Sequence, residues 1–302
     1  MLAPERLGFS GTEATGWERV IRGQRVHFRL LRTLPDLVHA ETMQEQVYGI
    51  SERDLTSATE LIVVEETGGA VIGVFLPDAP QRAAGVLVGW GGYVGKPRVV
   101  SDFMAVLPEA RNLGLAFEMK RLQAAIAASR GFVEIVWTVD PLLAANARLN
   151  FGKLGAVSRY YEIDRYGAGF AADRYGGMPS DRLHLVWDLA SPRVIARLRG
   201  EALPGITDDV PIFAPGIAAD RTLVPIPSDI DALMKTDFDM AREWRSRVRE
   251  QLMAAFGEGF AITGFLPARG DRMPAHVLAR PGDAVPQEWL PVHNVRRGKT
   301  GP

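Results

Sequence analysis

Apolar runs of strand length recur along the first 190 residues, with only a few helical stretches between them. Runs rich in β-branched and aromatic residues predict strands at 26–31, 60–66, 70–76, 85–94, 99–107, 132–139, 157–164 and 182–189. Apolar positions at helical spacing predict helices at 36–47 and 112–129, and a short one between Pro141 and about residue 153. Residues 1–25 are weakly patterned. Because most strands follow one another directly, we expect an α+β fold with a mostly antiparallel sheet.

The pattern of apolar and polar residues along the chain changes at Pro192. Proline-punctuated, irregular sequence runs to about residue 219, followed by the patterns of a strand (223–227), a long amphipathic helix (230–256) and two strands (260–266 and 275–280). We therefore expect a domain at 1–190, a small strand-helix-strand-strand region at 191–280 and a flexible tail at 281–302.

Charge and composition narrow the classes of partner. The 302 residues include 35 basic and 36 acidic side chains, for a net charge of −1, so nothing predicts a nucleic-acid or membrane-surface partner. The absence of cysteine excludes disulfides, thiolate metal sites and a cysteine nucleophile. The start of the chain lacks the apolar core of a signal peptide, and no apolar run is long enough to span a membrane. We expect a cytoplasmic protein.

Two common kinds of site are disfavoured. The five histidines show no metal-ligand spacing, so we expect no metal. The segment "GWGGYVGKP" fails as a phosphate-binding P-loop, because Trp90 stands where the first glycine is needed and Lys96 precedes Pro97 rather than Ser or Thr.

The helix containing "AREWRSRVREQL", residues 241–252, is interpreted as packing one face on a sheet. A homodimer contact, or closure of a binding site, is the alternative for it.

The segment "VLPEARNLGLA", residues 106–116, joins a predicted strand to a predicted helix. The free N–H groups of a helix's first turn and the helix dipole favour a phosphate. Gly114 would let the phosphate approach the backbone, and Arg111 would add a positive charge. Pro108 followed by Glu109 is equally typical of an ordinary helix start. On spacing alone the two interpretations stay open.

With its surroundings, this segment resembles the acyl-CoA-binding core of the GNAT N-acyltransferase superfamily. The resemblance covers roughly residues 26–190 and rests on the strand "VVSDFMAV", on Arg111-x-x-Gly114-x-Ala116, and on "NARLNFGKLGA" further along. It implies a sheet splayed open at the strand carrying Met104 to Val106, in a catalytic domain at 1–190. It further implies a set of residues that bind CoA: backbone groups of Met104, Ala105 and Val106 for the pantetheine arm, Arg111, Asn112, Leu113, Gly114, Leu115 and Ala116 for the pyrophosphate, and Asn146, Asn150, Phe151 and Lys153 along the following helix.

The chain departs from the family pattern at the proton donor. Many members carry Tyr four residues before the glycine aligned with Gly155, but Phe151 stands there, and the usual upstream Asn is Ala144. Asn146 or Asn150 would replace the lost Asn contact, or serve as plain helix-surface or capping residues.

Three residues are candidates for moving protons. Tyr160 and Tyr161 are candidate substitute acids, with packing in a strand as the alternative. Asp102 is the candidate general base, with a solvent-facing strand position as its alternative.

The resemblance implies direct transfer of an acetyl or succinyl group from acyl-CoA to the amine of a small acceptor, with amino acids as one acceptor class and no metal. Arg165, Arg174 and Arg182 are candidate partners for a carboxylate of the acceptor or acyl group, with solvated loop positions as the alternative. A different function is left open by Phe151, namely an acyl-CoA-binding sensor or scaffold without turnover.

Overall fold

The computed structural model describes residues 2–49, 55–167, 176–201 and 210–280. Arg174 and the predicted tail at 281–302 lie outside these residues. The strands are β1 Ser10–Thr12, β2 Gly16–Ile21, β3 Gln24–Leu30, β4 Ala70–Phe75, β5 Ala83–Tyr93, β6 Pro97–Val106, β7 Glu134–Val139, β8 Val157–Glu162, β9 Arg182–Asp188, β10 Arg221–Pro225, β11 Ala261–Leu266 and β12 Ala275–Ala279. The α-helices are α1 Leu34–Tyr48, α2 Ala58–Leu61, α3 Leu115–Ser129, α4 Ala144–Ala147, α6 Pro192–Arg199, α7 Ile230–Thr236 and α8 Phe238–Gly257.

The described strands form one sheet in the order β1-β2-β3-β4-β5-β6-β7-β9-β8-β11-β12-β10. Its neighbouring strands pair antiparallel, except for β6 and β7, which are parallel. The crossover between β6 and β7 contains α3, as a parallel connection requires. The α+β class with a mostly antiparallel sheet is therefore confirmed.

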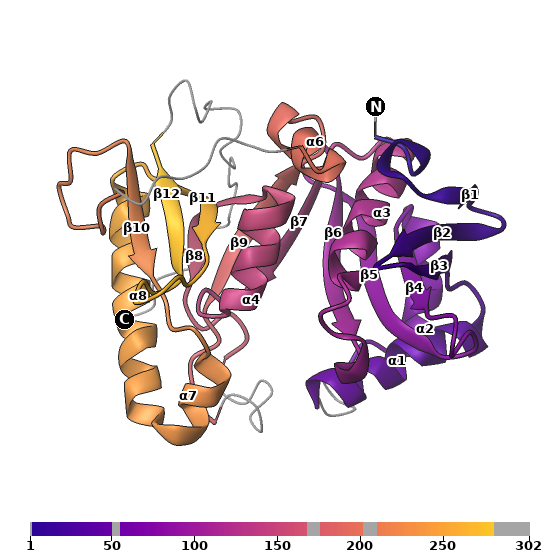
Figure 1. Ribbon diagram of the computed structural model, residues 1–302, viewed down its shortest axis with the longest axis horizontal. Coiled ribbons are helices and arrows are strands. Elements are labelled where there is room, and N and C mark those ends of the chain that lie inside the picture. Colours follow the sequence, from indigo (N-terminus) through magenta and orange to yellow (C-terminus); the bar gives the residue numbers. More distant parts are fainter. Residues whose placement is uncertain (1, 50–54, 168–175, 202–209, 281–302) are drawn as a thin grey trace.

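The sheet opens between β6 and β7. These strands pair only over residues 98–100 of β6 and 134–136 of β7, so residues 101–106 of β6 have no ladder partner on that side. In Figure 1 the two strands lie together near the top of the view and diverge toward the bottom. A β-bulge at Asp102 and Phe103 interrupts the pairing of β6 with β5 just where the separation begins. The splay expected at Met104 to Val106 is thus present.

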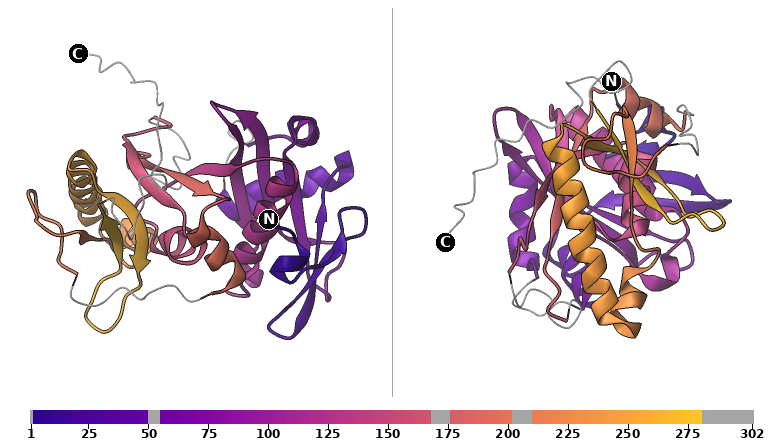
Figure 2. Two further views of the ribbon diagram at one scale, coloured as in Figure 1. Left: turned by 90° about the horizontal axis from the view of Figure 1, so that it is seen from above. Right: turned by 90° about the vertical axis from the view of Figure 1, so that its left-hand side faces the viewer.

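Strands of the C-terminal region extend the same sheet. β11 pairs antiparallel with β8 through Ile262 and Ser158, and α8 lies across one face of this part of the sheet (Figures 1 and 2). Buried side chains of the region, such as Phe260 and Leu278, belong to the same continuous hydrophobic core as Phe28 near the N-terminus. The C-terminal region is therefore packed onto the first 190 residues through shared core and shared sheet.

Two sequence predictions were wrong, and two parts of the fold were not predicted. The run 60–66 is helical: Ser57 accepts a hydrogen bond from the Glu60 N–H in a capping box that starts α2, which continues as the 3₁₀ helix η2, Ile62–Thr67. The long helix at 230–256 is two helices, because Asp237 leaves the helical conformation and caps α8 through the Met240 N–H. The weakly patterned N-terminus forms β1 and β2. The region after residue 190 also contains α6, which was not predicted.

Candidate functional site

The loop after β6 presents a row of backbone N–H groups. The 3₁₀ turn η3, Pro108–Ala110, ends at Arg111, and α3 begins at Leu115, three residues later than predicted. Within the described residues, none of the N–H groups of residues 112–116 has a protein acceptor. Asn112 and Gly114 have positive φ angles of 64° and 94°. Such left-handed residues at a helix N-terminus turn successive N–H groups toward one point, which is a geometry that binds anions.

The surroundings of this loop leave room and positive charge for an anion. A Cβ on Gly114 would meet nothing within 4 Å, so packing does not explain a glycine at this position. Arg111 is exposed and forms no ion pair within the described residues, whereas the nearby Glu109 carboxylate is paired with Arg82 at 3.0 Å. The loop is therefore a candidate site for a phosphate or pyrophosphate.

The second predicted CoA-binding segment lies beside the first turn of α3. α4 continues into η4, the π-helical segment Arg148–Leu154, and the Lys153 ammonium lies 6.0 Å from the ring centroid of Phe117 on α3. Asn146 is exposed, whereas Asn150 is buried. The structure therefore brings Lys153 near the loop at 112–116.

Phe151 faces the C-terminal region. It is fully buried, and its ring packs edge-on against His276 of β12, with 5.6 Å between the ring centroids. The His276 Nε2 lies 2.8 Å from the Pro141 carbonyl oxygen, and burial lowers the pKa of His276 to about 4. A neutral imidazole that donates this hydrogen bond fits its apolar surroundings. The position that carries Tyr in many GNAT members is therefore a packing position here.

Asp102 lies at the β6 bulge, where the strands begin to separate. Its carboxylate accepts a hydrogen bond from the Trp90 indole N–H at 3.2 Å. Desolvation by neighbouring protein atoms raises the pKa of Asp102, although part of the residue is solvent-accessible, and hydrogen bonds from Trp90 and Thr56 oppose the rise. A carboxyl with a raised pKa beside an open strand edge suits proton transfer.

The two candidate tyrosines are not brought close to Asp102. Both lie on β8, and two strands, β7 and β9, separate β8 from β6 in the sheet, which at about 4.8 Å per strand corresponds to roughly 14 Å. The Tyr161 hydroxyl donates to Asp181 at 2.6 Å, and burial beside that carboxylate raises the pKa of Tyr161. The Tyr160 ring packs edge-on against His184, with 4.8 Å between centroids.

A tyrosine that sequence reasoning missed does reach the splayed strand. The Tyr48 hydroxyl, at the end of α1, donates to the Met104 carbonyl oxygen at 2.5 Å. Tyr48 directly follows the helix predicted at 36–47, and nothing in its local pattern distinguishes it from a packing residue. Only the fold places it at β6.

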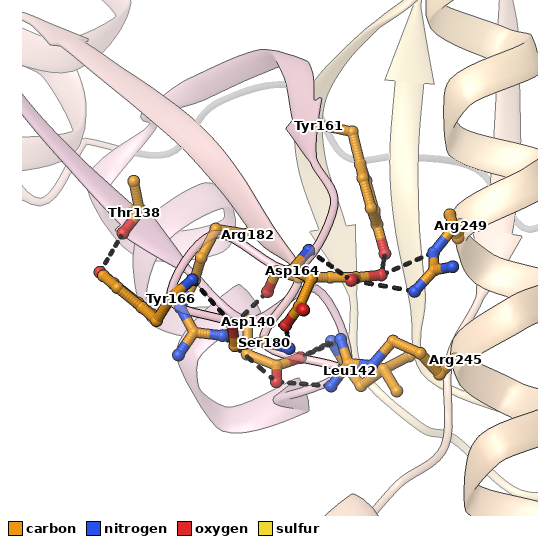
Figure 3. Close-up of polar contacts among 11 residues, drawn as sticks. Thr138, Asp140, Leu142, Tyr161, Asp164, Tyr166, Ser180, Arg182, Arg245 and Arg249 are labelled. Atoms are coloured by element: carbon orange, nitrogen blue, oxygen red, sulfur yellow. Dashed lines mark hydrogen bonds and ion pairs between the residues drawn. The ribbon is translucent and has the colours of Figure 1, made fainter. Parts of the chain in front are cut away.

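A buried ionic cluster joins α8 to the ends of β7 and β9 (Figure 3). Asp140, directly after β7, is bound by both terminal guanidinium nitrogens of Arg245 at 2.9 and 2.7 Å. Burial opposes the charged form of Asp140, but the Arg245 charge prevails and lowers the pKa of this carboxyl. Arg249 donates to both carboxylate oxygens of Asp181, from its Nε at 2.8 Å and from one terminal nitrogen at 3.0 Å. Helix α8 thus holds in place the segment that follows β7 and the segment that precedes β9, at one end of the sheet.

The predicted loop arginines lie near this cluster. Arg182 is buried, with a guanidinium nitrogen 3.8 Å from Asp140, and its guanidinium carbon lies 5.0 Å from the Tyr166 ring centroid. Arg165 pairs with Glu162 at 2.5 Å. Arg245 could have been found from sequence, because helical spacing places it on the same stripe as the buried Ala241 and Val248.

Comparisons with known proteins give structural matches only. No family model matches the chain, and no curated protein matches its sequence. The ribosomal-protein-S18-alanine N-acetyltransferase from Escherichia coli is similar at 14% identity over 55% of this chain and 95% of its own, with a TM-score of 0.44. An acetyltransferase of the GNAT family from Streptococcus pneumoniae is similar at 15% identity over 53% and 97%, with a TM-score of 0.42. Arabidopsis thaliana Naa50, solved with the bisubstrate analogue CoA-Ac-MVNAL, is similar at 12% identity over 53% and 97%, with a TM-score of 0.41.

The described residues contain no helix long and apolar enough to cross a membrane. They also contain no group of three or more His, Cys, Asp or Glu side chains placed to hold a metal ion.

Proposed function

We propose that this protein is a GNAT-type acyltransferase that moves an acyl group from acyl-CoA to the amine of a small acceptor by direct transfer. One observation carries the proposal: the row of free N–H groups at residues 112–116 directly follows a strand whose edge is unpaired from Ser101 onward. Along the chain, an open strand edge is followed directly by a phosphate site, and these two features match the two ends of the phosphopantetheine arm.

Binding would use backbone groups at both ends of that arm. The N–H groups of residues 112–116, the α3 dipole and the Arg111 charge would bind the pyrophosphate. The edge of β6 at Met104 to Val106 has no strand partner on the β7 side, although the Met104 carbonyl oxygen accepts from Tyr48, and it would pair with the pantetheine amides as an added strand does. Lys153, beside Phe117 at the start of α3, would add a second cation near the pyrophosphate.

The chemistry needs a neutral amine, an oxyanion donor and a proton for the departing sulfur. Asp102 would accept the proton of the attacking amine, directly or through water. Backbone N–H groups at the β6 bulge are candidate donors to the oxyanion. With Phe151 unable to donate a proton, the Tyr48 hydroxyl at Met104 is our candidate acid.

The acceptor amine would approach Asp102 at the splay. The proposed acceptor is a small amine such as an amino acid, and Arg165 and Arg182, which pair with or lie near the acidic side chains of Glu162 and Asp140, stay candidates for pairing with its carboxylate. Acetyl-CoA and succinyl-CoA are the two donors expected from the sequence.

The test compares CoA binding by two matched glycine variants. Gly114→Leu and Gly131→Leu impose similar backbone strain, because both glycines have left-handed φ angles (94° and 83°) and no atom within 4 Å of a built Cβ. Only Gly114→Leu blocks the N–H row, so we expect it alone to abolish CoA binding measured by calorimetry.

Turnover is followed separately, as release of free CoA thiol with a panel of amines. Equal CoA affinity in both variants, or no CoA binding by the unaltered protein, would refute the proposal. Tight CoA binding without turnover on any amine would instead support the acyl-CoA sensor, which Phe151 favours.

A further inference from the structure

A lysine is buried in the core at the apex of the splay. Lys120 of α3 is 3% exposed, and its ammonium donates to the Ser101 hydroxyl at 2.8 Å and to the Gln123 amide oxygen at 3.2 Å. It also lies 4.1 Å from the centroid of the Trp137 ring. Ser101 and Trp137 directly follow the last paired residues of β6 and β7, so Lys120 lies where the two strands separate.

The part of the chain that the structure describes gives this ammonium no counter-charge. Within the described residues no carboxylate lies within ion-pair distance of Lys120, unlike the buried Arg245, which is paired with Asp140. Burial alone lowers the pKa of Lys120 to about 7. An unpaired buried ammonium is costly, and a carboxylate brought by a ligand would remove that cost.

The lysine and the candidate base lie on opposite faces of the splayed strand. Successive side chains of a strand alternate between faces. The Ser101 side chain meets Lys120 and Gln123 of α3, whereas the neighbouring Asp102 meets Trp90 of β5 and Thr56, which precedes α2. An acceptor amine that approaches Asp102 would therefore lie on the face of β6 opposite Lys120, and an acyl chain that extends between β6 and β7 would point toward the buried Lys120 ammonium.

We propose that Lys120, with Ser101 and Gln123, binds the terminal carboxylate of the acyl group, so that the preferred donor is the CoA thioester of a short dicarboxylic acid. The inference rests on the proposed acyltransferase function and selects its acyl class. In the reaction the acceptor nitrogen bonds to the thioester carbon and the carbon–sulfur bond breaks. The proton lost by the amine ends on the CoA sulfur, and the distal carboxylate is unchanged. The products are free CoA and an N-acylated acceptor that carries a new carboxylate.

The test pairs succinyl-CoA with butyryl-CoA, its neutral four-carbon counterpart, in the full-length protein. Lys120→Met removes the charge at similar volume, and Lys235→Met is the matched control, because Lys235 is exposed on α7. We expect Lys120→Met to lower the affinity for succinyl-CoA about 10- to 100-fold, to leave butyryl-CoA binding unchanged or tighter, and to maintain or raise Tm. Lys235→Met should change none of these.

Proton uptake supplies a readout that does not depend on turnover. Because the pKa of Lys120 is about 7, the side chain is mostly neutral at pH 8 and would take up close to one proton when a carboxylate binds beside it. Calorimetry in buffers of different ionisation enthalpy should detect this uptake for succinyl-CoA and not for butyryl-CoA, and Lys120→Met should abolish it.

Three outcomes would overturn the inference. Equal affinity of the unaltered protein for both donors, with no proton uptake, would leave the acyltransferase proposal standing and remove this one. A Lys120→Met variant that binds both donors normally but loses turnover with each would make Lys120 part of the chemistry instead. A lower Tm with both affinities reduced equally would make it a structural residue. Failure of CoA and of both thioesters to bind would instead refute the proposed function itself.

Discussion

Replacing Arg245 with Met should strongly destabilise the protein, because it leaves the buried Asp140 carboxylate without its main partner. The side chains of Asp140 and Arg245 are 3% and 2% exposed and share two hydrogen bonds. Breaking such a pair costs about 3–5 kcal/mol. The Leu142 N–H, which donates to Asp140 at 2.8 Å, and Arg182 at 3.8 Å would compensate in part. We therefore expect a loss of about 3 kcal/mol at pH 7, or a fall in Tm of about 6–12 °C.

The pH dependence of this loss identifies the carboxylate as its cause. In the folded protein the pKa of Asp140 is lowered, so the stabilisation it contributes is present above the unfolded pKa and is lost as the pH falls through the folded one. In the variant, burial without Arg245 raises the pKa of Asp140, which then takes up a proton on moderate acidification. The difference in unfolding free energy between the two proteins should therefore shrink as the pH falls from 7 to about 5.

Urea denaturation of Arg245→Met, Asp140→Asn and the double variant measures the coupling directly. The double variant should recover much of the stability lost by Arg245→Met, since no unpaired carboxylate remains. A loss below about 1 kcal/mol, a loss independent of pH, or additive effects of the two changes would each refute this reasoning.

Two further predictions concern the candidate catalytic groups. Asp102→Asn should lower kcat by about 100-fold or more without lowering stability at pH 7, because desolvation disfavours the native carboxylate. In the unaltered protein kcat/KM should rise with pH through a pKa above the usual value for Asp. The Asp102→Asn variant should lose this rise. A full rate in the variant would exclude Asp102 as the base. Tyr48→Phe should lower kcat by about 100-fold with little change in affinity for the donor, whereas an unchanged kcat in steady-state assays would exclude Tyr48 as the acid.

The sequence predicted the parts of the fold whose local pattern and tertiary role agree. The β6–loop–α3 segment combines strong strand and helix patterns with turn residues at 111–114, whereas the splay was expected only from the resemblance to the GNAT superfamily. The run 60–66 was misassigned because its apolar residues suggest a strand, while a capping box at Ser57 starts a helix that leaves Ile62 and Val63 about 40% exposed. Local capping outweighed β-propensity there.

The polar part of the site was harder to predict, because its members come from distant parts of the chain. Arg245 and Asp140 are 105 residues apart, and Tyr48 and Met104 are 56 apart. Composition and spacing within one element carry no information about such pairs. Lys120 illustrates the same limit, since a lysine in a helix is ordinarily a surface residue and only packing against β6 and β7 makes it a buried one.

The pairing of β11 with β8 also covers part of a sheet edge. Without the region after residue 190, β8 would end the sheet, and its backbone around Ser158, which now pairs with Ile262, would be exposed next to the apolar surface that Phe265 and its neighbours cover. An open edge of this kind is a template for pairing with another chain. The C-terminal strands therefore act as a cap that keeps the sheet from growing between molecules, and a fragment ending near Leu189 would be prone to aggregate even if every CoA-binding residue were present.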